Sequence, residues 1–211
     1  MTTTPHPSRP FDAVLCDVDN VIRFYDSTPV AALERAAGLP EGATAAVAFA
    51  PEVDLPLMLG EIDTRQWVEA VVDGFAGRVH EELARELGAA LAASPFRADD
   101  EIVGLLRRAR AARIPLVLVT NATVELEKDL TAMGLSDLAD HVVSSARVGV
   151  AKPDPKIYEI AASLAGVAPE RCLFVDDSRE NVDAAVGLGM TGVVYRQPDD
   201  LRALLGPWID C

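Results

Sequence analysis

The stretch Phe11–Asp26, FDAVLCDVDNVIRFYD, decides the fold, because an apolar run ends there in two aspartates placed two positions apart. Residues i and i+2 of an extended strand point to the same side. If the strand continues that far, Asp17 and Asp19 hold two negative charges close together. Such a pair needs a shared proton or a nearby cation, so this strand end is the first candidate for a functional site.

Five short apolar runs in the chain predict β-strands: FDAVLCD, IPLVLVTN, HVVSS, RCLFVDD and TGVVY. Between the last four lie segments whose apolar residues recur every three or four positions, which is typical of helices. Strands that alternate with helices of this length pair in parallel through right-handed crossovers, so helices cover both faces of the sheet. We therefore expect an α/β fold with a Rossmann-like, doubly wound parallel sheet.

The first predicted strand stands apart, because about a hundred residues separate it from the second, far more than one crossover needs. Most of this interval has helical periodicity, as in TPVAALERAAG, DTRQWVEAVVDGF and VHEELARELGAALAA. We predict an α/β core over residues 11–22 and 97–211, interrupted by a helical subdomain, called the cap below, over residues 23–96. Residues 1–10, MTTTPHPSRP, are expected to form a disordered tail.

Composition and charge exclude several classes of partner. The 211 residues carry a formal net charge of −14 at pH 7, which is unlike the basic face that a nucleic-acid-binding protein needs. No apolar run approaches the ~20 residues of a membrane helix, and the N-terminal segment lacks the apolar stretch of a signal peptide. The three cysteines form neither a disulfide framework nor a zinc spacing, so we expect a cytoplasmic protein.

Polar residues follow the predicted strands, and ligands of open parallel sheets bind beyond the carboxyl ends of the strands. Beside the first aspartate pair, these residues are Thr120, Asn121, Ser144, Ser145, Asp176 and Asp177, with Lys152 in GVAKPDPKIY. Carboxylates from two strands at one edge disfavour a proton-sharing pair and favour a hard divalent cation such as magnesium. The ammonium of Lys152 and the hydroxyl of Thr120 are suited to the oxygens of a phosphate group.

The ordered motifs DVDNV, VTNAT, KPDPKIY and VDDSREN resemble those of the haloacid dehalogenase-like hydrolase superfamily. That family carries an Asp-x-Asp, a Ser or Thr, a Lys and an acidic pair, each at or near the end of a core strand. The helical insertion after the first motif looks like the small type 1 cap of subfamily IA. The resemblance covers essentially the whole chain after the tail.

The resemblance implies a role for each residue that matches a motif. Asp17 would attack phosphorus and form an aspartyl-phosphate, which water would then hydrolyse. Asp19 would protonate the leaving oxygen and afterwards activate the water. Thr120, Asn121 and Lys152 would hold the transferring phosphoryl group.

The resemblance also implies a magnesium site. The ion would be bound by the carboxylates of Asp17 and Asp177 and by the backbone carbonyl of Asp19. Asp176 would support it directly or through water, and Asn181 would orient the acidic loop.

Two residues beside the first motif are particular to this chain. Asn20 stands where the family usually has glycine, and asparagine tolerates left-handed backbone better than most residues, so the tight turn can survive. Arg23 follows where the chain leaves for the cap. It is a candidate contact to an anionic substrate at the entrance.

The main hypothesis is a magnesium-dependent phosphomonoester phosphatase that acts on a small phosphorylated metabolite. Asp19 argues against a dehalogenase, which would lack the second aspartate. Residues 23–96 contain no lysine, which argues against a phosphonate hydrolase that forms a Schiff base. Two alternatives stay open: a phosphomutase of the same fold, and a non-catalytic regulatory protein that binds phosphate or a partner.

Overall fold

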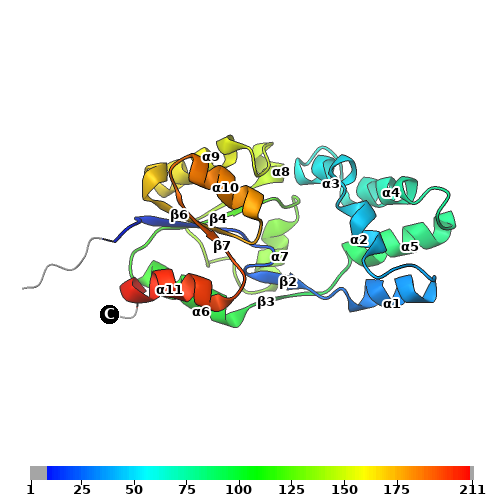
Figure 1. Ribbon diagram of the computed structural model, residues 1–211, viewed down its shortest axis with the longest axis horizontal. Coiled ribbons are helices and arrows are strands. Elements are labelled where there is room, and N and C mark those ends of the chain that lie inside the picture. Colours follow the sequence, from blue (N-terminus) through cyan, green and yellow to red (C-terminus); the bar gives the residue numbers. More distant parts are fainter. Residues whose placement is uncertain (1–8, 210–211) are drawn as a thin grey trace, which may run out of the picture.

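The computed structural model describes residues 9–209 and has a five-stranded parallel sheet at its centre (Figure 1). Its strands are β1 (Ala13–Cys16), β4 (Leu116–Thr120), β5 (His141–Ser144), β6 (Cys172–Asp176) and β7 (Thr191–Val194). Their order in the sheet is β5-β4-β1-β6-β7, and each neighbouring pair is parallel. The five predicted strands and the predicted α/β class are confirmed. Strand β1, which leads into the first aspartate pair, lies in the middle.

Helices cover both faces of the sheet, with α6 and α11 on one face and α9 and α10 on the other (Figure 1). The helices of this α/β core are α6 (Asp100–Ala111), α7 (Leu126–Ala132), α8 (Ser145–Val148), α9 (Pro155–Ala165), α10 (Arg179–Gly187) and α11 (Pro198–Ile209), with a 3-10 turn at Pro169–Arg171. Alternate residues of β1 enter different clusters, Val14 and Cys16 on the α6 side and Ala13 and Leu15 on the α9 side. Burial of both faces explains why the three central strands, β1, β4 and β6, are continuous apolar runs.

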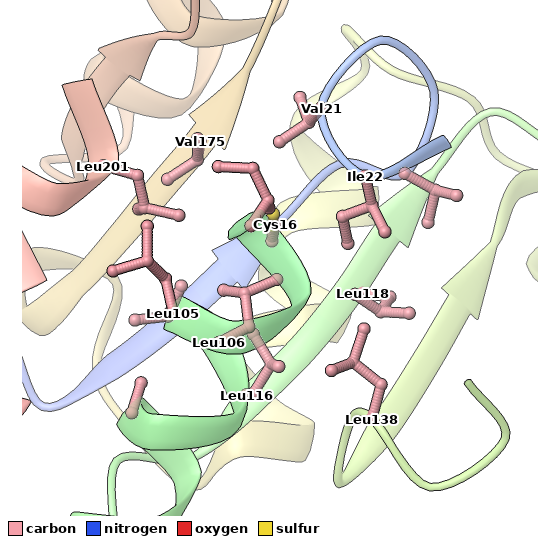
Figure 2. Packing of buried hydrophobic residues seen from close by; sticks show 14 of the residues in the cluster. Cys16, Val21, Ile22, Leu105, Leu106, Leu116, Leu118, Leu138, Val175 and Leu201 are labelled. Atoms are coloured by element: carbon pink, nitrogen blue, oxygen red, sulfur yellow. The ribbon is translucent and has the colours of Figure 1, made fainter. Parts of the chain in front are cut away.

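Figure 2 shows the packing on the α6 side of the sheet. Leu105 and Leu106 of α6 and Leu201 of α11 join Leu116 and Leu118 of β4 in one buried cluster. Leu105 and Leu106 lie on the apolar face of α6, and this face packs against the sheet. This cluster holds the central strands firmly, and with them the polar residues at their ends.

The cap consists of five helices that pack around a cluster of their own. They are α1 (Thr28–Ala36), α2 (Ala43–Ala48), α3 (Pro51–Met58), α4 (Thr64–Gly74) and α5 (Glu81–Ala92). Trp67, Val71, Phe75 and Leu87 are buried among them. In Figure 1 the cap lies beside the α/β core, with α3 next to α8. None of the described helices is both long and apolar enough to cross a membrane.

A two-stranded antiparallel ribbon, β2 (Arg23–Tyr25) with β3 (Phe96–Ala98), joins the cap to the core. Phe24 and Ala98 pack against the α6-side cluster of the core. The rings of Tyr25 and Phe96 meet edge to face, with centroids 5.7 Å apart. The ribbon was not predicted, because three-residue strands are too short to show an alternating pattern. Both ends of the expected cap range, 23–96, lie in this ribbon.

The cap also contacts the core near the end of β5. The hydroxyl of Ser145 donates a hydrogen bond of 2.5 Å to the carbonyl of Met58. Gly60 has a φ of +72°, and a Cβ built there would lie 2.9 Å from the carbonyl oxygen of Ala146. Glycine therefore permits both the left-handed turn and the close approach of the two backbones.

The expected tail lies mostly outside the described residues, which begin at position 9. The guanidinium of Arg171 donates to the carbonyl oxygens of Arg9 and Pro10, at 2.8 and 3.1 Å, and also pairs with Asp12. The last two residues of the expected tail are thus held against the turn before β6.

Candidate active site

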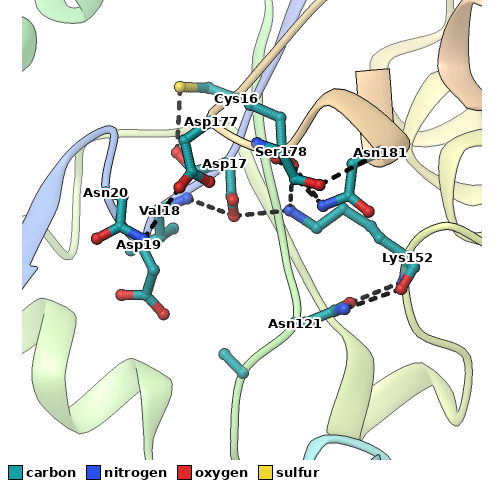
Figure 3. A network of polar contacts seen from close by, with 12 residues as sticks. Cys16, Asp17, Val18, Asp19, Asn20, Asn121, Lys152, Asp177, Ser178 and Asn181 are labelled. Carbon is teal, nitrogen blue, oxygen red and sulfur yellow. Dashed lines mark hydrogen bonds and ion pairs between the residues drawn. The ribbon is translucent and has the colours of Figure 1, made fainter. Parts of the chain in front are cut away.

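Asp17 follows β1 directly and is buried, with 5% of its surface exposed. Its Oδ1 accepts a hydrogen bond of 2.7 Å from the backbone N–H of Val18 and lies 2.8 Å from Nζ of Lys152 (Figure 3). Within residues 9–209, no hydrogen bond reaches its Oδ2. One oxygen of Asp17 is therefore fixed, and the other can meet a ligand.

Lys152 lies in the loop between α8 and α9 and reaches into the site (Figure 3). Its ammonium is buried and lies 2.8 Å from Asp17 and 2.6 Å from Asp176. Its backbone is held by Asn121, whose Nδ2 donates to the Lys152 carbonyl at 3.0 Å and whose Oδ1 accepts from the Lys152 N–H at 2.7 Å. The structure thus places Asn121, expected at the phosphate, on the Lys152 backbone. In this arrangement the amide orients the lysine.

Asp176 ends β6 and is completely buried. Its carboxylate accepts hydrogen bonds from Lys152 Nζ at 2.6 Å, from Asn181 Nδ2 at 3.1 and 3.2 Å, and from the backbone N–H of Ser178 at 2.8 Å. Both of its oxygens are therefore occupied by donors of the protein. Asn181, expected to orient the acidic loop, contacts Asp176 directly.

A cluster of three carboxylates lies at this edge of the sheet. One oxygen each of Asp17, Asp176 and Asp177 lies within 4.8 Å of the other two. Lys152 supplies one positive charge against these three carboxylates, so a negative charge remains at the cluster. Closely spaced carboxylate oxygens with a residual negative charge suit a hard divalent cation such as Mg²⁺.

The ionisation of the cluster reflects its burial. Burial raises the pKa of Asp17 to about 7; Lys152 opposes this rise, while Asp176 and Asp19 add to it. Burial, together with the neighbouring Asp176, also raises the pKa of Asp177. For Lys152, burial favours the neutral amine, but the adjacent carboxylates outweigh it and raise the pKa of the ammonium. A further cation would therefore stabilise the ionised form of the carboxylates.

Asn20 closes the turn after the first motif in the conformation that we predicted. Its φ is +59°, so its left-handed backbone is confirmed. Its Nδ2 donates a hydrogen bond of 3.0 Å to Oδ2 of Asp177. Glycine at this position would allow the turn but would offer no donor to Asp177. The asparagine thus links the loop after β1 to the acidic pair after β6.

Arg23 is buried, although we expected it to be near the substrate entrance. Its Nε and Nη2 donate to the two carboxylate oxygens of Asp19 at 2.6 and 2.9 Å, and its Nη1 donates to Asp129 of α7 at 2.7 Å. The guanidinium is therefore committed to two carboxylates in this arrangement. Sequence reasoning missed Asp129, which lies 106 positions further along the chain.

Thr120 ends β4, with 1% of its surface exposed. Its hydroxyl is buried and has no hydrogen-bond partner among the described residues. A buried hydroxyl without a partner is unfavourable, so an oxygen-rich ligand at this position would satisfy it. The donor that we expected for a phosphate group is therefore not used by the described protein.

Comparisons with known proteins agree with this geometry. The family model described as haloacid dehalogenase-like hydrolase matches residues 11–189. A "Phosphatase" of Mycobacterium tuberculosis is 36% identical over 95 residues, which are 45% of this chain and 44% of that protein. The "Phosphorylated carbohydrates phosphatase" of Thermotoga maritima is 28% identical over 203 residues, covering 92% of this chain and 90% of that protein.

Among solved structures, a HAD family enzyme of Bacteroides thetaiotaomicron in complex with magnesium and inorganic phosphate has a TM-score of 0.64 at 18% identity. The matched region covers 86% of this chain and 92% of the Bacteroides chain, which shows that the two have the same fold. The family match extends over far more than half of the sequence and includes the whole Asp17, Lys152 and Asp176 constellation. The chain therefore belongs to the haloacid dehalogenase-like hydrolases.

Proposed function

We propose that the protein is a magnesium-dependent phosphatase that hydrolyses the phosphomonoester of a small phosphorylated metabolite. The observation that carries this proposal is the carboxylate of Asp17, whose Oδ1 is held by Val18 and Lys152 while Oδ2 has no partner among the described residues. A carboxylate held in this way presents one oxygen as a nucleophile. The relatives named as phosphatases support the same reaction class.

Mg²⁺ would be held by the carboxylates of Asp17 and Asp177 and by the backbone carbonyl of Asp19. The oxygens of Asp176 are engaged by protein donors, which favours a supporting position beside the ion. When bound, the ion would neutralise the carboxylate cluster and polarise the phosphoryl oxygens. The neighbour from Bacteroides was solved with magnesium and phosphate, which supports the choice of ion.

The reaction would proceed in two steps at Asp17, transfer of the phosphoryl group to its carboxylate and then hydrolysis of the aspartyl-phosphate. Its Oδ2 would form a bond to phosphorus while the bond from phosphorus to the ester oxygen breaks, and Asp19 would give its proton to that oxygen. The products would be an alcohol and an aspartyl-phosphate. Water would then attack phosphorus, Asp19 would take the proton, and inorganic phosphate would leave with the Asp17 carboxylate restored.

Lys152 and Thr120 would stabilise the phosphoryl group during both steps. The buried ammonium of Lys152 offsets negative charge beside Asp17, and the hydroxyl of Thr120 is a donor that no described residue uses. Donors fixed in a site with little water act strongly on charge that develops in the transition state. The cap beside this edge would exclude water and contact the part of the substrate that leaves.

The test is hydrolysis of p-nitrophenyl phosphate and of a panel of phosphorylated metabolites, with Mg²⁺ and after chelation. We expect activity that needs Mg²⁺ and is lost in Asp17→Asn, with Asp137→Asn as the control because that side chain is 84% exposed. Activity that survives both chelation and Asp17→Asn would refute the mechanism. Inactivity on every ester would favour a binding protein, and exchange between phosphorylated isomers would favour a mutase.

A further inference from the structure

The guanidinium of Arg23 is a second buried cation beside the catalytic loop, after the ammonium of Lys152. The side chain of Arg23 is 4% exposed, and all three guanidinium nitrogens donate to carboxylates: Nε and Nη2 to Asp19, and Nη1 to Asp129. Burial alone would favour the neutral form, but the hydrogen bonds and charge of Asp19 outweigh it and raise the pKa of Arg23. The guanidinium is therefore permanently charged and grips Asp19 through two parallel hydrogen bonds.

The position of this guanidinium is set from three elements. Its carbon lies 5.0 Å from the ring centre of Tyr25 in β2 and 5.5 Å from that of Phe96 in β3. Asp129 holds the third side from α7. The guanidinium therefore has little freedom, although the side chain of Asp19 that it grips is 30% exposed.

Backbone hydrogen bonds also hold Arg23 to the turn that carries Asp19. The N–H of Asn20 donates to the carbonyl of Arg23 at 2.8 Å, and the N–H of Arg23 donates to the carbonyl of Val18 at 2.8 Å. Arg23 thus closes the turn that carries Asp19 and binds its side chain as well. In Figure 3 the Asp19 carboxylate points away from Lys152. Without Arg23, this carboxylate would be free to turn toward the nearest cation.

We propose that Arg23 is a positioning residue that aims the Asp19 carboxylate at the oxygen of the leaving group and keeps it apart from the cluster of Asp17, Lys152 and Asp176. This inference rests on the proposed phosphatase function. Tyr25 and Phe96 belong to the ribbon between core and cap. The strands that attach the cap therefore also help to orient Asp19, the proton donor. Asp129 neutralises the remaining side of Arg23 and fixes it from the core.

The test compares two classes of phosphomonoester. An alkyl ester needs a proton on its leaving oxygen, whereas p-nitrophenolate is a stable anion and needs little acid assistance. If Arg23 aims Asp19, Arg23→Met lowers kcat on alkyl phosphates by about tenfold to a hundredfold, a part of the ~10²–10⁴ of general acid catalysis, and changes kcat on p-nitrophenyl phosphate by less than about threefold. Arg23→Lys, which keeps the charge but not the two parallel donors, shows a smaller loss of the same selectivity.

Arg85→Met is the matched control, because Arg85 also donates to two carboxylates, those of Glu69 and Glu81, on the exposed surface of the cap. It should leave both activities unchanged. In an Asp19→Asn background, Arg23→Met should cause no further selective loss on alkyl esters. A purely structural arginine would lower both activities together and would add to the effect of Asp19→Asn.

The outcomes separate this inference from the proposed function. If the unmodified protein hydrolyses neither class of ester, the phosphatase proposal fails, and the positioning role fails with it. If it hydrolyses both, and the Arg23 variants lose the two activities equally or lose none, the phosphatase stands and the positioning role is refuted. Should Arg23→Met fail to fold, Arg23→Lys decides by the same ratio of kcat values.

Discussion

Replacing Lys152 with methionine would test the buried ion cluster most directly. The substitution removes the ammonium that lies 2.8 Å from Asp17 and 2.6 Å from Asp176, whose side chains are 7% and 0% exposed. Methionine approximates the volume of the lysine stem but offers no charge. Removing one partner of a buried ion pair costs about 3–5 kcal/mol, because the other charge is left without compensation. For a chain of this size, 1 kcal/mol corresponds to roughly 2–4 °C, so we expect Tm to fall by about 6–20 °C.

The assay is thermal and urea unfolding beside the same substitution at Lys128. Lys128 is 82% exposed on its side chain and lies 3.3 Å from Glu125, so Lys128→Met should cost less than about 1 kcal/mol. The difference between the two variants isolates the effect of burial. Equal losses in both variants would contradict the buried cluster.

The loss of stability in Lys152→Met should also depend on pH. Burial raises the pKa of Asp17 to about 7, and removing Lys152 removes the neighbour that lowers it. In the unfolded chain an aspartate titrates near pH ~4, so the unmodified protein loses stability through Asp17 as pH rises from about 4 to 7 and then levels off. Without Lys152 the pKa of Asp17 is higher still, so the stability of the variant continues to fall above pH 7. The deficit of Lys152→Met should therefore be larger at pH 8 than at pH 5. A deficit that does not change with pH would refute this reasoning.

Two further predictions concern buried polar atoms without partners among the described residues. Thr120→Val should change stability by less than about 1 kcal/mol, because its hydroxyl makes no hydrogen bond there, yet lower kcat/KM on a phosphate ester by about tenfold or more; a large drop in Tm with normal kinetics would contradict it. Burial raises the pKa of Asp54 in α3 to about 6, so the folded protein loses stability as pH rises from about 4 to 6. Asp54→Asn should therefore stabilise the protein by about 1–2 kcal/mol at pH 7 and have almost no effect near pH 4, as melting curves at both pH values would show. A variant that is less stable at pH 7 would count against a half-buried carboxylate whose Oδ1 has no partner among the described residues.

The parallel sheet could be predicted because the strands beside β1 are buried on both faces and appear as unbroken apolar runs, as in LVLVT of β4. The convergence of Asp17 and Asp176 follows from the same topology, since parallel strands end at one edge. The backbone of Asn20 was predictable from local chemistry alone, because its left-handed conformation depends on the residue type.

The contacts that orient these groups could not be predicted in the same way. Asn121 binds the backbone of Lys152 from 31 positions away, and Asp129 reaches Arg23 from 106 positions away. Such pairs depend on how helices and loops pack, which periodicity and spacing do not describe. The sequence pattern identified which residues meet at the site. Of the residues that hold the others in place, it pointed to Asn181 but not to Asn121 or Asp129.

The ribbon of β2 and β3 also has a consequence for how the chain could be rebuilt. Tyr25 and Phe96 are register partners, so the segment that carries all five cap helices leaves the core and returns to it at adjacent points. These helices have a hydrophobic cluster of their own. A short hairpin turn between Tyr25 and Phe96 could replace the whole insertion without breaking a strand of the sheet. The α/β core and the cap are thus separate units of the fold, and a different insertion could be joined to the same core.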